Sequence, residues 1–257
     1  MSIVWLGFLG SLAAGMMTAV GAVPALFGKT VSRRTTDIML GFAAGVMLAA
    51  TFFSLLAPAV EISGRQYGGA VMPAVVAAIG VVLGAATVMF FDERLPHEHF
   101  IVGREGPEAA ELRRIWLFVF AITLHNAPEG MAVAVGFGAG DWETGSQIAL
   151  GIGLQNAPEG LAVAVALISK DYPRRFAFLV AALTGLVEPV AGLFAAIAVS
   201  LSAALLPWAM AFAAGAMLYV ISHEIIPETH RHGHQKRATQ GLLFGFVLMM
   251  ALDVALG

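Results

Sequence analysis

Long runs of hydrophobic residues recur along the whole chain, and short polar stretches separate each run from the next. An α-helix of roughly 20 apolar residues crosses a hydrocarbon core of about 30 Å. The pattern therefore predicts an all-α, polytopic membrane protein whose 257 residues form a single transmembrane domain. The eight predicted spans cover approximately residues 3–27, 36–60, 70–91, 115–139, 146–168, 176–200, 206–227 and 239–256.

The composition agrees with this pattern and narrows the chemistry. Hydrophobic residues make up 59% of the chain and charged residues only 12%, whereas an ordinary globular domain is about 25% charged. The absence of cysteine excludes disulfides, thiolate metal ligands and thiol redox reactions. No basic residue precedes the first apolar run, so we expect a membrane span there rather than a cleaved signal peptide.

The basic residues predict an orientation. Thirteen of the fourteen Lys and Arg residues fall in the linkers that follow spans one, three, five and seven, and only Arg65 falls on the other side. Linkers rich in Lys and Arg remain in the cytoplasm. We therefore expect these four linkers in the cytoplasm and both termini outside it.

A heptapeptide occurs twice in the middle of the chain. Leu124–Gly130 reads LHNAPEG and Leu154–Gly160 reads LQNAPEG, and ten of the thirteen positions that start at residues 124 and 154 are identical. The copies lie in consecutive, antiparallel spans, which predicts pseudo-two-fold symmetry with a site between them. Pro128 and Pro158 lack a backbone N–H, which predicts kinked helices whose freed carbonyls line a cavity or find other partners.

Six ionisable residues lie in the interior of the predicted spans, and none of them is Lys or Arg. A carboxylate at a helix centre costs about 2.5–3.5 kcal/mol, so three glutamates would cost roughly 8–10 kcal/mol without compensation. Protons or bound cations must therefore supply the missing positive charge. Protonated glutamates and a packed histidine that only form hydrogen bonds between helices are the competing explanation. The six residues are His125, Glu129, Glu159, Glu188, His223 and Glu224.

Helical spacing brings amides and an imidazole next to the glutamates, because residues three or four apart share a helix face. Imidazole, carboxylate and amide ligands suit Zn²⁺, and also Fe²⁺, Mn²⁺, Co²⁺ and Cd²⁺. Two carboxylates flanked by amides predict a site near the midplane for one or two ions. The candidates are His125, Asn126, Glu129, Gln155, Asn156, Glu159 and Glu188; Met47 reaches a similar depth, although such a methionine alone is more often core filler.

Residues outside this cluster carry weaker signals. The linker segments 97–99 (His-Glu-His) and 230–234 (His-Arg-His-Gly-His) indicate either loose metal binding or solvated polar loops, and both interpretations stay open. Acidic residues at the span ends, Asp37 and Glu228 on the cytoplasmic side and Glu61 and Asp253 outside, would attract cations or simply be solvated. Three Gly-x-x-x-Gly pairs, at 41/45, 80/84 and 241/245, predict close helix packing.

The sequence favours metal transport over two other functions. His223-Glu224 begins like a zinc-protease motif, but Pro227 stands where the second histidine would be required. An intramembrane metalloenzyme, or a metal sensor without flux, uses the same His/Glu cluster and remains the alternative.

With these motifs the chain resembles the ZIP family of divalent metal transporters, and most closely its bacterial members of the Bordetella type. The resemblance rests on both heptapeptides, Glu188-Pro189, Ser222-His223-Glu224, the segment 41–50 and the loop 97–99. It implies a 3+2+3 arrangement in which the outer span triplets are inverted repeats around spans four and five. It also implies metal movement into the cytoplasm, the sliding of one helix bundle past another, and a homodimer.

The resemblance further implies a binuclear site. The first metal would be held by Met47, His125, Glu129, Gln155 and Glu159. The second would involve Asn126, Asn156 and Glu188, with Glu129 and Glu159 bridging the two ions. His223 and Glu224 would line the release route, and Asp253 would lie on the metal path.

Three features depart from the family pattern. Asn156 stands where the close bacterial relative has aspartate, which removes a negative charge from the second site. Gln155 stands where many members have histidine, and we expect no counterpart of the extra N-terminal span of that relative. These departures concern metal selectivity and the occupancy of the second site rather than the family.

Overall fold

The computed structural model describes residues 2–27, 32–94, 107–138, 142–231 and 233–256, without the side chains of 92–94, 107–114, 117, 121, 125 and 256. All regular elements among these residues are helical. Eight helical stretches are long and apolar enough to cross a membrane. The prediction of an all-α integral membrane protein with eight spans is therefore confirmed.

Five spans are single helices, whose limits agree with the prediction within a few residues except for α5, which begins well before residue 115. They are α1 (Ile3–Leu26), α4 (Val71–Arg94), α5 (Pro107–Gly138), α6 (Trp142–Ile168) and α11 (Gln235–Leu256). The N-terminal helices begin at serines: Ser2 Oγ accepts the N–H of Trp5, and Ser32 Oγ accepts that of Thr35. Serine is favoured there because its hydroxyl satisfies a free N–H of the first turn.

Three spans are compound. The second consists of α2 (Arg33–Ala49), the π-helix η1 (Ala50–Leu56) and α3 (Ala57–Tyr67). The sixth is divided at Leu186 into α7 (Arg174–Gly185) and α8 (Val187–Leu201). The seventh comprises the 3₁₀ turn η2 (Ala203–Leu205), α9 (Leu206–Val220), the π-helix η3 (Ile221–Ile225) and α10 (Ile226–His230).

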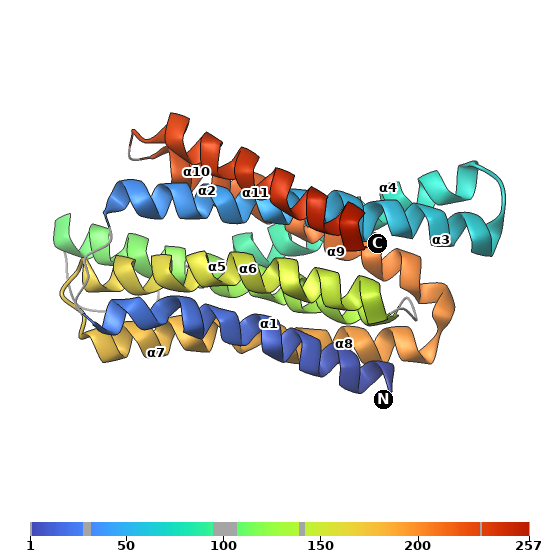
Figure 1. The fold of residues 1–257 in the computed structure, drawn as a ribbon, viewed down its shortest axis with the longest axis horizontal. Helices are drawn as coiled ribbons and strands as arrows, with labels where there is room; N and C mark the ends of the chain where they lie inside the picture. The colour runs from blue at the N-terminus through green and yellow to red at the C-terminus, as the bar shows by residue number, and fades with distance from the viewer. Residues whose placement is uncertain (1, 28–31, 95–106, 139–141, 232, 257) are drawn as a thin grey trace.

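The helices form two bundles (Figure 1). The first bundle contains α1, α5, α6, α7 and α8, where α1 packs most extensively on α6 and α5 on α8. The second bundle contains α2, α3, α4, α9, α10 and α11, where α2 packs on α11 and α4 on α9. Contacts of α2 with α6 and of α5 with α9 join the bundles.

The two ends of the molecule differ in charge. Both termini lie at one end in Figure 1. At the other end, which we call the basic end, α2 begins with Arg33 and α7 with Arg174, and Lys236 and Arg237 lie in the first turn of α11. At this end His234 Nδ1 also contacts Asp37 Oδ2 at 2.7 Å, which ties the start of α11 to α2.

Glycines set the close helix contacts inside the second bundle. A Cβ at Gly41, Gly45, Gly241 or Gly245 would overlap a carbonyl oxygen of the facing helix in the α2–α11 pair. In the α4–α9 pair, a Cβ at Gly84 or Gly215 would likewise overlap a carbonyl oxygen of the facing helix. The predicted role of the Gly-x-x-x-Gly pairs is confirmed at these positions.

The second bundle also contains a repeat that the sequence analysis did not identify. Residues 42–48 read FAAGVML and residues 212–218 read FAAGAML, and both segments lead into a π-helix that is followed by a proline. Spans two and seven run in opposite directions, so the repeat relates them by inverted symmetry. Met217 is thereby the counterpart of Met47, and both side chains are fully buried.

Candidate metal-binding site

Both copies of the heptapeptide lie inside uninterrupted helices of the first bundle. The α5 helix continues through Pro128 to Gly138, and α6 continues through Pro158 to Ile168. Proline is tolerated within a membrane span where neighbouring helices satisfy the freed backbone groups. Helix α1 packs against both α5 and α6.

The glycine that ends each copy allows a neighbouring backbone to approach. A Cβ at Gly130 would overlap the backbone carbonyl of Glu188, and a Cβ at Gly160 would overlap that of Thr18. The first copy is therefore held against α8, and the second copy is held against α1. Because Glu188 belongs to the candidate set, the first contact also fixes the position of a predicted ligand.

Two hydrogen bonds connect α1 directly to the repeated segments. Ser11 Oγ donates to the backbone oxygen of Gly130 at 3.1 Å, and Asn156 Nδ2 donates to that of Ala14 at 2.9 Å. One helix thus holds the first copy through a side chain and the second copy through its backbone. Sequence reasoning did not identify α1 as part of the site, because a serine and a backbone carbonyl carry no motif.

The polar side chains of the repeat meet across three helices. Gln155 Nε2 donates to Glu129 Oε1, which joins the two copies. Asn156 Nδ2 also donates to Glu188 Oε1 at 2.7 Å, which joins the second copy to α8. None of the six described amides and carboxylates is more than 1% exposed: Asn126, Glu129, Gln155, Asn156, Glu159 and Glu188.

Several amide atoms in this cluster are buried without a hydrogen bond. Within the described part of the chain, no partner is found for Asn126 Nδ2 and Oδ1, Gln155 Oε1 or Asn156 Oδ1. Leaving a buried polar group unsatisfied costs about 1–3 kcal/mol. Amide oxygens are suitable ligands for divalent cations, so a bound cation would satisfy them.

Glu188 owes its position to a break in the sixth span that the hydropathy pattern did not predict. Pro189 cannot donate a backbone hydrogen bond to Gly185, so the helix is interrupted at Leu186 and begins again at Val187. Glu188 then lies in the first turn of α8. A carboxylate is favoured there because the helix dipole is positive at its N-terminus.

The structure does not complete the predicted ligand set. Residue 125 lies in α5, but the side chain of His125 is outside the described residues. Among the side chains that are described, no group of three His, Asp or Glu is arranged to hold a metal. Met47 lies in the apolar core of the molecule together with Ile148, Ile152 and Met217. The metal-ligand assignments therefore remain predictions.

The predicted pathway residues belong to other elements than the buried cluster. His223 and Glu224 occupy η3, toward the basic end, where the His223 ring is exposed and stacks on Tyr219 with the ring centroids 5.0 Å apart. Asp253 lies near the end of α11, where Oδ1 accepts a hydrogen bond from Ser54 Oγ at 2.6 Å. The predicted metal-binding loop at 97–99 is outside the described residues.

Comparisons with known proteins point to one family. The sequence pattern described as "ZIP Zinc transporter" matches residues 101–253. The chain is 47% identical to the zinc transporter GufA of Myxococcus xanthus over 251 residues, which cover 98% of this chain and 99% of that protein. It is 49% identical to the zinc transporter ZIPB of Bordetella bronchiseptica over 250 residues, which cover 97% and 81%. It is 37% identical to the zinc transporter ZIP11 of Homo sapiens, with 100% and 98% covered.

Proposed function

Because this chain belongs to the ZIP family of zinc transporters, we propose that it carries Zn²⁺ into the cytoplasm through the polar cluster of the heptapeptide repeat. The observation that carries this proposal is the set of six buried amides and carboxylates contributed by α5, α6 and α8. A membrane interior without a compensating cation does not favour so many polar groups. Zinc is the cargo named for the relatives described above.

We propose two unequal metal sites within this cluster. The tighter site uses Met47, His125, Glu129, Gln155 and Glu159, and the weaker site uses Asn126, Asn156 and Glu188, with Glu129 and Glu159 shared between them. The weaker site lacks a carboxylate at residue 156, and the Asn156 amide nitrogen faces Glu188, where it cannot bind a metal. The ligand types also suit Cd²⁺, Fe²⁺, Mn²⁺ and Co²⁺ as further cargoes.

Movement of the cargo is proposed to be facilitative or coupled to an ion gradient. The separation of the helices into two bundles supports a mechanism in which one bundle slides past the other. The functional unit is proposed to be a homodimer of single-domain chains in the bacterial inner membrane, with both termini outside the cytoplasm.

Zinc uptake into proteoliposomes tests the proposal. We expect saturable uptake by the wild-type chain and a loss of at least about tenfold for His125→Ala and for Glu129→Gln, since each removes a proposed ligand. Glu143→Gln is the matched control, because Glu143 is an exposed glutamate in the first turn of α6.

Three results would contradict the proposal in different ways. Normal uptake by well-expressed His125→Ala and Glu129→Gln variants would exclude the assigned site. Zinc binding without flux would favour a sensor or an intramembrane enzyme. No zinc binding by the wild-type chain would indicate that the buried glutamates are protonated residues that only pack.

A further inference from the structure

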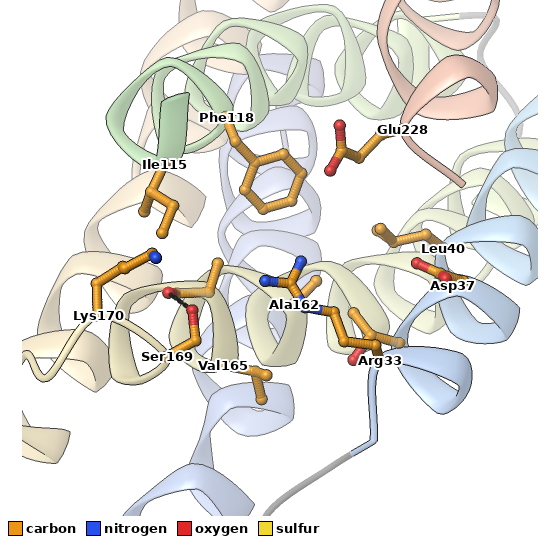
Figure 2. A pocket seen from close by; sticks show the side chains of 12 residues that line it. Arg33, Asp37, Leu40, Ile115, Phe118, Ala162, Val165, Ser169, Lys170 and Glu228 are labelled. Atoms are coloured by element: carbon orange, nitrogen blue, oxygen red, sulfur yellow. Dashed lines mark hydrogen bonds between the residues drawn. The ribbon is translucent and has the colours of Figure 1, made fainter. Parts of the chain in front are cut away.

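A cavity of about 310 Å³ opens between the two bundles near the basic end. Arg33, Asp37 and Leu40 of α2 and Glu228 of α10 line it from the second bundle. Residues of α5 and α6, with Lys170 directly after α6, line it from the first (Figure 2). The cavity is therefore bounded by both bodies that the proposed transport mechanism moves.

The cavity lies two helical turns from the polar cluster, on the same helix faces. Leu40 precedes Met47 by seven residues in α2, and Ala166 follows Glu159 by seven residues in α6. Residues seven apart lie on nearly the same face of a helix, roughly 10 Å apart along its axis. The cavity therefore lies on the side of the cluster that faces the basic end.

The charged side chains of the lining balance one another. Among the lining residues that the structure describes, Arg33 and Lys170 contribute two positive charges and Asp37 and Glu228 contribute two negative charges. Both carboxylates also have a partner outside the lining: Glu228 pairs with Arg231 at 3.0 Å, and Asp37 contacts His234 at 2.7 Å. Figure 2 shows Lys170 on one side, Asp37 and Glu228 on the other, and the Arg33 guanidinium between them. An acidic vestibule for cations would have shown an excess of carboxylates instead.

The cavity is small enough for its charged side chains to act together on an ion inside it. A sphere of that volume is roughly 8 Å across, which is about one Debye length at physiological ionic strength. Any ion inside it therefore experiences all four charges. A zinc ion attracted by Asp37 and Glu228 is repelled by Arg33 and Lys170, and the charge of Glu228 is further offset by Arg231, whose guanidinium lies 3.0 Å away.

We infer that Arg33 and Lys170 determine release: they offset the two carboxylates, so that the cavity passes Zn²⁺ on instead of retaining it. The inference rests on the proposed function, because it assumes that zinc leaves the polar cluster through this cavity. Nothing in the family assignment requires basic residues on a cation exit route. Their effect is electrostatic, so it depends on charge and distance and not on a direct contact with the metal.

The test is the rate at which zinc-loaded protein gives up its metal to an excess of chelator, measured by stopped flow at low ionic strength. One positive charge about 8 Å from a divalent ion changes its binding about fivefold. We expect Arg33→Gln and Lys170→Gln each to slow release about fivefold and Arg33→Lys to restore the wild-type rate. Glu228→Gln should accelerate release by a similar factor, and 0.5 M salt should reduce all these differences.

The chain supplies closely matched controls. Arg34→Gln removes the same charge one residue away, and Lys236→Gln removes an exposed lysine of α11; neither residue lines the cavity. Equal release rates for Arg33→Gln and Arg34→Gln would overturn the inference. The same holds if Glu228→Gln slows release. If the wild-type chain transports zinc in proteoliposomes, such results would remove only this inference and leave the proposed function standing.

Discussion

The side-chain amide of Asn156 joins α6 to two other helices. Its amide nitrogen donates to Ala14 of α1 and to Glu188 of α8, and its oxygen has no hydrogen-bond partner among the described residues. The nitrogen therefore stabilises the structure, and the oxygen is the atom that the proposed second site would use as a ligand. These two roles predict a trade-off between stability and metal binding.

Asn156→Asp should lower the stability of the zinc-free protein and strengthen metal binding. The carboxylate cannot donate to Ala14, and it places a negative charge beside Glu188, so we expect a loss of about 3 kcal/mol in the zinc-free protein. The apparent melting temperature should then fall by about 5–10 °C. Zinc should raise the melting temperature of Asn156→Asp by more than it raises that of the wild-type chain, because the second site gains a charged ligand. Thermal unfolding in detergent with and without zinc measures both effects.

The control for this change is Gln240→Glu, which makes the same amide-to-carboxylate replacement at an exposed position of α11. It should alter neither the melting temperature nor the effect of zinc. A zinc-free Asn156→Asp protein as stable as the wild-type chain would contradict the structural role assigned to the amide.

At the residue scale the sequence indicated which polar residues lie inside the spans, and their role as metal ligands stays a prediction. The duplicated glutamates and amides, together with the absence of intramembrane Lys and Arg, were sufficient to single out residues that the structure buries together. The sequence could not show how they are held. Ser11 and the Ala14 carbonyl are ordinary features of an apolar span, and their hydrogen bonds to Gly130 and Asn156 depend on the helix arrangement.

Among the elements, α1 connects both repeated segments. It contacts α5, α6, α7 and α8, although it carries no charged residue itself. Close approach between α1 and α6 requires the absence of a side chain at Gly160 and also at Gly21, where a Cβ would overlap the Ala157 carbonyl. The close contact between α1 and α6 therefore involves backbone atoms of both helices.

Gly160→Ala should loosen this contact. The added methyl group would overlap the Thr18 carbonyl, and overpacking of this kind costs about 1–3 kcal/mol. The apparent melting temperature should fall by roughly 4–8 °C, and zinc affinity should decrease because Asn156 and Glu159 shift with α6. Thermal unfolding and equilibrium zinc binding test the two effects.

Gly64→Ala serves as the comparison, since a Cβ there would meet only Pro73 Cγ at an ordinary 3.7 Å. Alanine is favoured over glycine in a helix by about 0.5–1 kcal/mol, so this variant should be as stable as the wild-type chain or slightly more stable. If Gly160→Ala behaves like Gly64→Ala, the α1–α6 contact is not as tight as described.

Most span limits were predictable from hydropathy, but the start of α5 at Pro107, the end of the second span at Tyr67 and the irregularities within the spans were not. A hydropathy pattern registers the length of an apolar run, and it is unaffected by the break at Leu186 or by the π-helices η1 and η3. The break at Leu186 follows from Pro189. The π-helices follow similar FAAG segments in spans two and seven, so the sequence contained a signal that only comparison of the two segments reveals.

For the whole molecule, the grouping of helices could not be derived from the order of spans. Spans one, four, five and six form one bundle, and spans two, three, seven and eight form the other, so the chain passes between the bundles after spans one, three and six. Hydropathy gives no information on such contacts. The alternation of basic linkers along the eight spans, in contrast, did predict that both chain termini lie on the side away from the basic end (Figure 1).

The direction of transport depends on which end faces the cytoplasm, and the absence of cysteine makes this directly measurable. Ala204→Cys places a thiol at the end that carries the termini, and Lys236→Cys places one at the basic end; both positions are exposed. Twelve of the thirteen basic residues on that side remain in the second variant, so the charge asymmetry that sets orientation is kept. A membrane-impermeant maleimide should therefore label residue 204 in intact cells and residue 236 only after permeabilisation. The reverse labelling would place the basic end outside, and the cavity between Arg33 and Glu228 would then be an entrance for zinc, not its exit.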